Sequence, residues 1–118
     1  DVLKSYPDLQ GIFAITSVAL PGAAEGLRKA QAADKVFLTG LSTPGSMKDY
    51  VADGTCKEFV LWSPVDLGYL TVHAAVAAAK EALAEGAATF DAGRLGAVAV
   101  NGSELVLGPP IRFTAENI

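Results

Sequence analysis

The sequence predicts an α/β fold of the doubly wound type, a βαβαβα parallel sheet followed by a C-terminal β-hairpin. Three short apolar runs are each followed by residues at helical spacing, and a turn signal then separates two further extended runs. Apolar runs that alternate with helices indicate a parallel sheet buried on both faces. With 118 residues, 51% of them hydrophobic and 19% charged, the chain can bury the core of one ordinary domain.

The first elements follow from spacing and from proline. Residues 1–7 have the pattern of the last turns of a helix, which Pro7 ends. A short apolar run over 11–16 predicts a strand, and residues 20–27 follow it at helical spacing. Pro21 suits the first turn of that helix. The chain therefore begins within a helix and continues with a strand and a second helix.

Two more strand and helix pairs complete the parallel part. The run over 35–41 predicts the second strand, and Thr43 is the expected N-cap of a helix that ends at Gly54. The run over 58–63 predicts the third strand. A Ser-Pro-Val-Asp capping box then opens a long, alanine-rich helix over 64–86.

The pattern changes after the helix over 64–86. Asn101-Gly102 is a strong hairpin signal, and it lies between two extended runs at 97–100 and 104–107. Residues 111–113 form a last short extended piece. The sequence therefore predicts a hairpin and a return segment rather than a fourth strand and helix pair.

Charge and motif content exclude several function classes. The net charge of −4 and the scattered basic residues disfavour nucleic acid and anionic lipid as partners. Neither of the glycine-rich phosphate-loop motifs occurs, and the aspartates show no spacing typical of acid–base pairs or metal ligands. His73 and Cys56 are the single histidine and the single cysteine, and neither has an identifiable catalytic partner. We expect no enzymatic activity, no metal and no cofactor.

Candidate binding residues lie in the loops that follow the strands. Ligands of open α/β sheets bind at the carboxyl ends of the strands. Here those loops carry no charged residue and offer hydroxyls, backbone amides and one indole, which suits a small neutral polyol. Helix capping alone also explains Thr43 and Ser63, and Trp62 fits the core equally well. The candidates from these loops are Thr16, Ser17, Pro21, Ser42 and Trp62.

Several short stretches resemble bacterial sugar-binding proteins along nearly all of the chain. The similarity is to the C-terminal part of the type I periplasmic solute-binding proteins, and within them to the rhamnose-binding and autoinducer-2-binding branch. The matching stretches are Tyr6–Ile12, Ala19–Ala24, Thr39–Pro44, Met47–Thr55, Leu61-Trp62 with Asp66–Leu70, and Leu107–Pro110 with Phe113 and Asn117-Ile118.

This resemblance implies a function and a set of ligand contacts. In the family, two α/β lobes close over a sugar in the periplasm and deliver it to the membrane permease of an ABC importer. Pro21 and Ala23 match positions that contact ligand in autoinducer-2-binding members. Trp62 falls where ribose binders have glutamine, Thr16-Ser17 where they have Asn-Asp, and Ser42 where they have Asp. These differences favour a deoxy sugar or a small furanosyl ligand.

The resemblance also implies a division of the chain. Because family members are longer, we expect this chain to be an incomplete C-terminal fragment. Residues 1–63 would be βα units of the C-terminal lobe, residues 64–86 a helix that packs on the N-terminal lobe, and residues 87–118 the hairpin and return segment. The unpartnered helix predicts self-association of the isolated chain.

Two other function classes remain open at this point. The effector-binding domain of a LacI-type transcription regulator has the same fold, and the sequence ahead of Asp1 would distinguish it, by a helix-turn-helix instead of a signal peptide. A flavodoxin-like enzyme would need a phosphate loop or an acid–base pair at the strand ends. The leading prediction is a sugar-binding module, with a small neutral sugar or autoinducer-2 and a permease as its partners.

Overall fold

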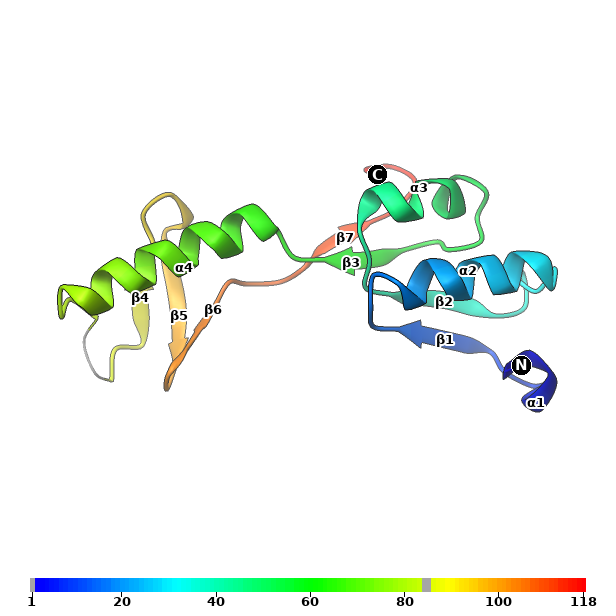
Figure 1. Cartoon of the computed structure of the whole chain (residues 1–118), viewed down its shortest axis with the longest axis horizontal. Helices are drawn as coiled ribbons and strands as arrows, with labels where there is room; N and C mark the ends of the chain where they lie inside the picture. The colour runs from blue at the N-terminus through cyan, green and yellow to red at the C-terminus, as the bar shows by residue number, and fades with distance from the viewer. Residues whose placement is uncertain (1, 84–85) are drawn as a thin grey trace. The chain divides into compact units, whose positions relative to one another are not determined.

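The computed structural model describes residues 2–83 and 86–118, and the chain forms two compact units (Figure 1). The first unit comprises Asp1–Leu61 together with Ile111–Ile118, and the second comprises Trp62–Pro110. The chain thus leaves the first unit after its third strand and returns to it with its last strand.

The first unit contains the predicted parallel strands. β1 and β2 pair in parallel over four residues each, and a parallel bridge between Leu41 and Val60 connects β2 to β3. β7 lies antiparallel beside β3, with Phe59 opposite Phe113 and their rings stacked at 5.2 Å between centroids. The strands are β1 (Gly11–Ala14), β2 (Phe37–Gly40), β3 (Phe59–Leu61) and β7 (Ile111–Phe113).

The helices α2 and α3 cover this sheet and bury its core. The helices of the first unit are α1 (Val2–Ser5), α2 (Ala19–Lys29) and α3 (Pro44–Ala52). Apolar residues of α2 and α3 at spacings of three and four face the sheet, as the periodicity predicts. The buried core comprises Ala14, Leu20, Ala24, Leu27, Val36, Leu38, Met47, Val51, Cys56 and Phe59.

A polar cluster joins α2 to the end of α3. The Arg28 guanidinium pairs with Glu25 at 2.6 Å and with Asp53 at 3.2 Å, and it stacks over the Tyr50 ring at 4.5 Å. The Tyr50 hydroxyl also donates to Glu25 at 3.2 Å. The hydrogen bond from Arg28, followed by that from Lys29, lowers the pKa of Glu25. Because these side chains are exposed to solvent, their ion pairs add little to the free energy of unfolding and mainly fix how α2 and the end of α3 face one another.

Gly40 permits the close approach of β1 and β2. Its φ of +152° is a conformation that residues with a Cβ rarely adopt, and a Cβ there would lie 1.8 Å from the Ala14 carbonyl oxygen. That oxygen accepts a hydrogen bond from the Leu41 amide at 2.9 Å. The pairing of the two strand ends therefore depends on a glycine at this position.

The second unit is a helix packed on an antiparallel sheet. Its elements are α4 (Pro64–Ala79), β4 (Thr89–Asp91), the 3-10 helix η1 (Gly93–Leu95), β5 (Ala97–Asn101) and β6 (Glu104–Val106). The predicted hairpin is confirmed, since β5 and β6 pair with Asn101 opposite Glu104. β4 was not expected, and it adds a third strand beside β5. Leu70, Ala92 and Val98 form the buried core of this unit.

The helix predicted over 64–86 is shorter than the sequence indicates. Ser63 caps α4 as expected, because its Oγ accepts from the Asp66 amide at 3.1 Å. The helix ends at Ala79 rather than at Gly86, because Glu81 takes a left-handed φ of 54° and the Ala82 amide donates back to the Ala77 carbonyl at 2.8 Å. This is a Schellman motif in which Glu81 occupies the position usually held by glycine. Residues 84 and 85 of the expected helix lie outside the described residues.

Much of the apolar surface of α4 is exposed in this chain. Val65 is 74% exposed, Val72 63% and Val76 48%, whereas Leu70 is buried against the sheet of the second unit. Over residues 2–83 and 86–118, none of the helices is long and apolar enough to cross a membrane.

Candidate ligand-binding site

The three parallel strands end at one edge of the first unit. β1 ends at Ala14 and β2 at Gly40, which are paired directly, and β3 ends at Leu61 beside the bridge to β2. The residues that follow β1 and β2 are Thr16-Ser17 and Ser42-Thr43, and Trp62 follows β3 along the chain. The topology therefore brings the loops after β1 and β2 together, as the fold class predicts.

Thr16 and Ser17 are exposed and shape the entry to α2. The Thr16 hydroxyl accepts a hydrogen bond from the Ala19 amide at 3.0 Å, and the Thr16 carbonyl accepts one from the Leu20 amide at 3.1 Å. This arrangement uses a lone pair of the Thr16 hydroxyl and leaves its proton for donation. Thr16 is therefore suited to donate a hydrogen bond to a ligand at the strand ends.

Ser42 is a buried residue that connects the loop after β2 to the loop after β1. Its side chain is fully buried, and its hydroxyl donates to the Ser17 carbonyl at 3.3 Å. The Ser42 Oγ also lies 2.9 Å from the Ser46 Oγ. The structure thus brings Ser17 and Ser42 together, with Ser42 behind the exposed loop surface.

The expected capping by Thr43 is only partly correct. Thr43 occupies the N-cap position of α3 with an extended backbone, but its side chain makes a different contact from that of Ser63. The Thr43 Oγ1 lies 2.9 Å from the Ser46 Oγ, because Ser46 stands one helical turn further on. Sequence reasoning missed Ser46, although a hydroxyl residue three positions after an N-cap is a recognisable signal.

Pro21 and Ala23 lie within the first turns of α2 and are partly buried. Ala23 packs against the core and lines an apolar groove of about 580 Å³, together with Leu3 and Ile12. These two residues present backbone and apolar surface on α2, while the hydroxyls lie in the loop before that helix.

Trp62 is the first residue of the second unit and is 43% exposed. This exposure is incompatible with the alternative of a fully buried core side chain within this chain. An exposed indole can cover the C–H face of a sugar while its N–H donates a hydrogen bond.

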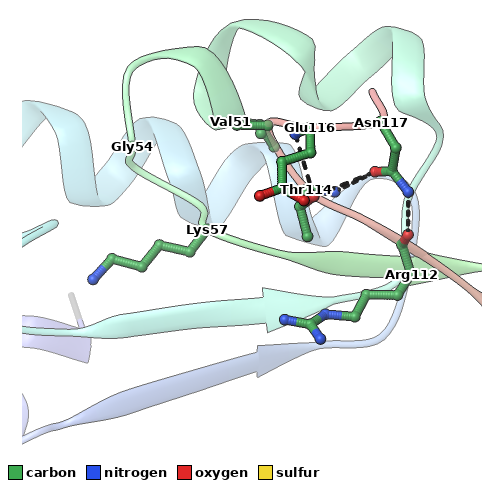
Figure 2. Close-up of a pocket in the computed structure, with 8 residues that line it drawn as sticks. Val51, Gly54, Lys57, Arg112, Thr114, Glu116 and Asn117 are labelled. Carbon is green, nitrogen blue, oxygen red and sulfur yellow. Dashed lines mark hydrogen bonds between the residues drawn. The ribbon is translucent and has the colours of Figure 1, made fainter.

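A separate cavity lies at the opposite edge of the first unit. It has a volume of about 580 Å³, and it is lined by residues near the start of β3 and after the end of β7 (Figure 2). Asn117 holds its wall together, because its Oδ1 accepts from the Thr114 amide at 2.7 Å and its Nδ2 donates to the Arg112 carbonyl at 2.9 Å. Lys57 and Arg112 make this cavity charged, in contrast to the uncharged loops at the carboxyl ends of the strands.

His73 and Cys56 make structural contacts. The His73 ring lies against the Tyr69 ring at 4.3 Å between centroids on α4. The Cys56 thiol is fully buried, and its sulfur lies 3.5 Å from the Leu38 carbonyl oxygen and 3.4 Å from the Glu58 carbonyl oxygen, either of which can accept its one proton. Burial raises the pKa of Cys56, so its thiol stays protonated and unreactive at neutral pH.

Known proteins share the fold of this chain. The model of a family described as "Periplasmic binding protein domain" matches residues 1–83. A sugar ABC transporter from Actinomyces odontolyticus is 39% identical over 98% of this chain, with a TM-score of 0.81. An ABC transporter solute-binding protein from Clostridium phytofermentas, solved with bound L-rhamnose, is 30% identical over 98% of this chain, also with a TM-score of 0.81.

A further solved structure shows the same fold. LsrB from Clostridium saccharobutylicum, in complex with AI-2, is 24% identical over 98% of this chain, with a TM-score of 0.78. The chain covers 38% of the Actinomyces protein and 40% of each clostridial protein. Membership of such a family implies a location outside the cytoplasm. On the family match and on these identities, the chain belongs to the periplasmic binding protein family.

Proposed function

We propose that this chain is the C-terminal part of the solute-binding component of a bacterial sugar ABC importer. The observation that carries this proposal is the chemistry of the strand ends, where hydroxyls and an exposed indole occur without a charged side chain. Such groups exchange hydrogen bonds with a neutral polyol and need no counter-charge. The protein binds its ligand and passes it on without chemical change.

Known relatives support the class of ligand. The 30%-identical clostridial protein holds L-rhamnose, and LsrB, which shares the fold, holds AI-2. A rhamnose-like sugar or autoinducer-2 is therefore the proposed ligand. The Actinomyces relative is a sugar ABC transporter, which favours an importer component over the effector domain of a LacI-type regulator.

The candidate residues have distinct roles in this proposal. Thr16 donates a hydrogen bond to the sugar, and Trp62 covers its C–H face. Pro21 and Ala23 contact it through backbone and apolar surface. Ser42 is buried and acts indirectly, because its hydroxyl donates to the carbonyl of Ser17 and so fixes the loop that faces the sugar.

The three parts of the chain have corresponding roles in the whole receptor. Residues 1–63 form the C-terminal-lobe wall of an interlobe cleft, and residues 87–118 return the chain to that lobe. The helix within 64–86 packs on the N-terminal lobe, which would cover the exposed Val65 and Val72. Closure of the lobes over the sugar presents the periplasmic receptor to its membrane permease.

The same exposed helix face predicts the behaviour of the isolated chain. Without the other lobe, Val65 and Val72 meet water, so we expect the 118-residue chain to self-associate. Analytical ultracentrifugation tests this expectation, and a monodisperse monomer would contradict it.

Calorimetric titration of the full-length receptor tests the function. We expect binding of at least one of L-rhamnose, D-ribose and autoinducer-2, and a loss of about tenfold to a hundredfold in affinity for Trp62→Ala, from the contribution of one aromatic contact. Tyr6→Ala is the matched control, because Tyr6 is an aromatic residue that is 61% exposed on the α1 side. Equal affinities for Trp62→Ala and wild type would remove Trp62 from the site, and no binding of any of the three ligands would contradict the function.

A further inference from the structure

Three hydroxyls, of which that of Ser42 is buried and those of Thr43 and Ser46 are exposed, form a continuous series of contacts after the end of β2. The Thr43 Oγ1 lies 2.9 Å from the Ser46 Oγ, and the Ser46 Oγ lies 2.9 Å from the Ser42 Oγ. The Ser42 hydroxyl in turn donates to the Ser17 carbonyl at 3.3 Å. These hydrogen-bonded hydroxyls thus connect the exposed Thr43, through Ser46 in the first turn of α3, to the backbone of Ser17 in the neighbouring loop.

Counting protons gives this series of contacts a direction. Each hydroxyl has one proton and two lone pairs. Because Ser42 donates to Ser17, the contact between Ser42 and Ser46 requires the proton of Ser46, and the contact between Ser46 and Thr43 then requires the proton of Thr43.

An alternative partner for Ser46 is the Thr43 carbonyl, at 2.9 Å from its Oγ. That carbonyl already accepts from the Ser46 amide at 3.2 Å. If the Ser46 hydroxyl donated there, the Ser42 and Ser46 oxygens would face one another at 2.9 Å unless Ser42 withdrew its proton from Ser17. Donation from Thr43 to Ser46, from Ser46 to Ser42 and from Ser42 to Ser17 is therefore the arrangement in which each of these contacts has a donor and an acceptor.

We propose that Thr43, Ser46 and Ser42 form a one-way hydroxyl relay that makes Thr43 a specificity-determining hydrogen-bond acceptor and Ser42 a positioning residue. The ligand contact of Thr43 rests on the proposed sugar-binding function, whereas the relay itself is a property of the unliganded protein. Since the Thr43 proton is used in the contact with Ser46, the lone pairs of its exposed oxygen are what it offers to a ligand.

The relay predicts which sugars the site selects. Thr16 keeps its proton for donation, and Thr43 accepts, so the two exposed threonines make opposite demands on a ligand. A sugar must then offer one hydroxyl as a donor to Thr43. A methyl ether at that hydroxyl cannot donate, so it should bind wild type about fivefold more weakly, the equivalent of one hydrogen bond.

The relay can be tested without any ligand, by NMR of the full-length receptor. The amide of Val18 follows the Ser17 carbonyl, so its chemical shift reports whether Ser42 donates there. We expect Ser42→Ala to move the Val18 resonance. Ser46→Ala and Ser46→Thr should leave it close to wild type, because Ser42 keeps its own proton for Ser17, and the exposed turn serine variant Ser103→Ala should leave it unchanged. An unchanged Val18 resonance in Ser42→Ala, or a clear shift in Ser46→Ala, would overturn the relay, because Ser42 would then donate to Ser46 instead of Ser17.

The ligand contact is tested by calorimetry with L-rhamnose. Thr43→Val keeps the shape of the side chain and removes the hydroxyl, and we expect about fivefold weaker binding. Thr71→Val is the matched control, because the Thr71 hydroxyl donates to the Leu67 carbonyl within α4 at 2.8 Å. Unchanged affinity in Thr43→Val would overturn the specificity role.

A double variant tests whether Thr43 and Ser46 act together. Because the two share one relay, Thr43→Val combined with Ser46→Ala should weaken binding by less than the product of the two single effects. A double effect equal to that product would overturn the coupling. A wild-type receptor that binds no L-rhamnose would contradict the proposed ligand, while the Val18 resonance still decides the relay.

Discussion

Replacement of Gly40 by alanine tests the packing of the strand ends that carry the candidate site. A Cβ at this position would lie 1.8 Å from the Ala14 carbonyl oxygen and 2.6 Å from its carbonyl carbon. Both atoms belong to the backbone of β1, so the clash cannot be relieved by rotation of a side chain. The φ of +152° adds strain of about 1–3 kcal/mol for a residue with a Cβ. The overlap adds about 1–3 kcal/mol, the usual cost of overpacking.

The expected result is therefore a loss of about 4 kcal/mol in the free energy of unfolding for Gly40→Ala. Urea denaturation followed by circular dichroism measures this loss, and hydrogen exchange at the Leu41 amide locates it, because that amide donates to the Ala14 carbonyl. Gly26→Ala is the matched control. A Cβ at Gly26 meets no atom within 4 Å, and alanine should stabilise α2 by about 0.5–1 kcal/mol. Equal stability of the two variants would refute the close approach of β1 and β2.

Three further predictions concern other parts of the chain. The Cys56 thiol should react with a disulfide reagent only slowly in the native protein and rapidly in urea, because it is fully buried; equal rates would contradict its burial. The pKa of Glu25 should rise toward its ordinary value in Arg28→Met, since Arg28 is the main cause of its lowering. The stabilisation from this pair is present above the ordinary carboxyl pKa of about 4.3 and is lost as the pH falls through the lowered pKa. An NMR titration with the same Glu25 pKa in both proteins would contradict this account. Gly93→Ala should reduce the thermal stability of the second unit, because its Cβ would lie 2.6 Å from the Tyr69 hydroxyl at a φ of +61°; an unchanged melting temperature would contradict that packing.

Local patterns predicted most of the fold. The parallel strands follow from apolar runs bounded by loops, and the hairpin follows from Asn101-Gly102, because these signals lie within a few neighbouring residues. β4 could not be predicted in the same way, since it has three residues of which Phe90 alone is partly buried. The end of α4 was also missed. Its alanine-rich sequence favours helix beyond Ala79, and the left-handed turn at Glu81 occurs without a glycine.

The candidate site was predicted in composition but not in geometry. The hydroxyls and the indole of the strand-end loops are evident from the sequence. The burial of Ser42 and its bond to Ser17 depend on the pairing of β1 with β2, which brings together residues that lie 25 positions apart. The role of Ser46 depends in turn on the buried position of Ser42. Sequence therefore identified the chemical groups, and tertiary pairing determined which of them are exposed at the strand ends and which are buried.

Chemical-shift mapping of the full-length receptor tests the central claim most directly. The receptor would be titrated with whichever of L-rhamnose, D-ribose and autoinducer-2 binds most tightly, and its amide and indole resonances would be followed. We predict the largest changes, within this chain, at Ser17, at Thr43 and at the indole of Trp62. Changes confined to the charged cavity around Lys57 and Arg112 would contradict the claim that the uncharged strand ends bind the sugar.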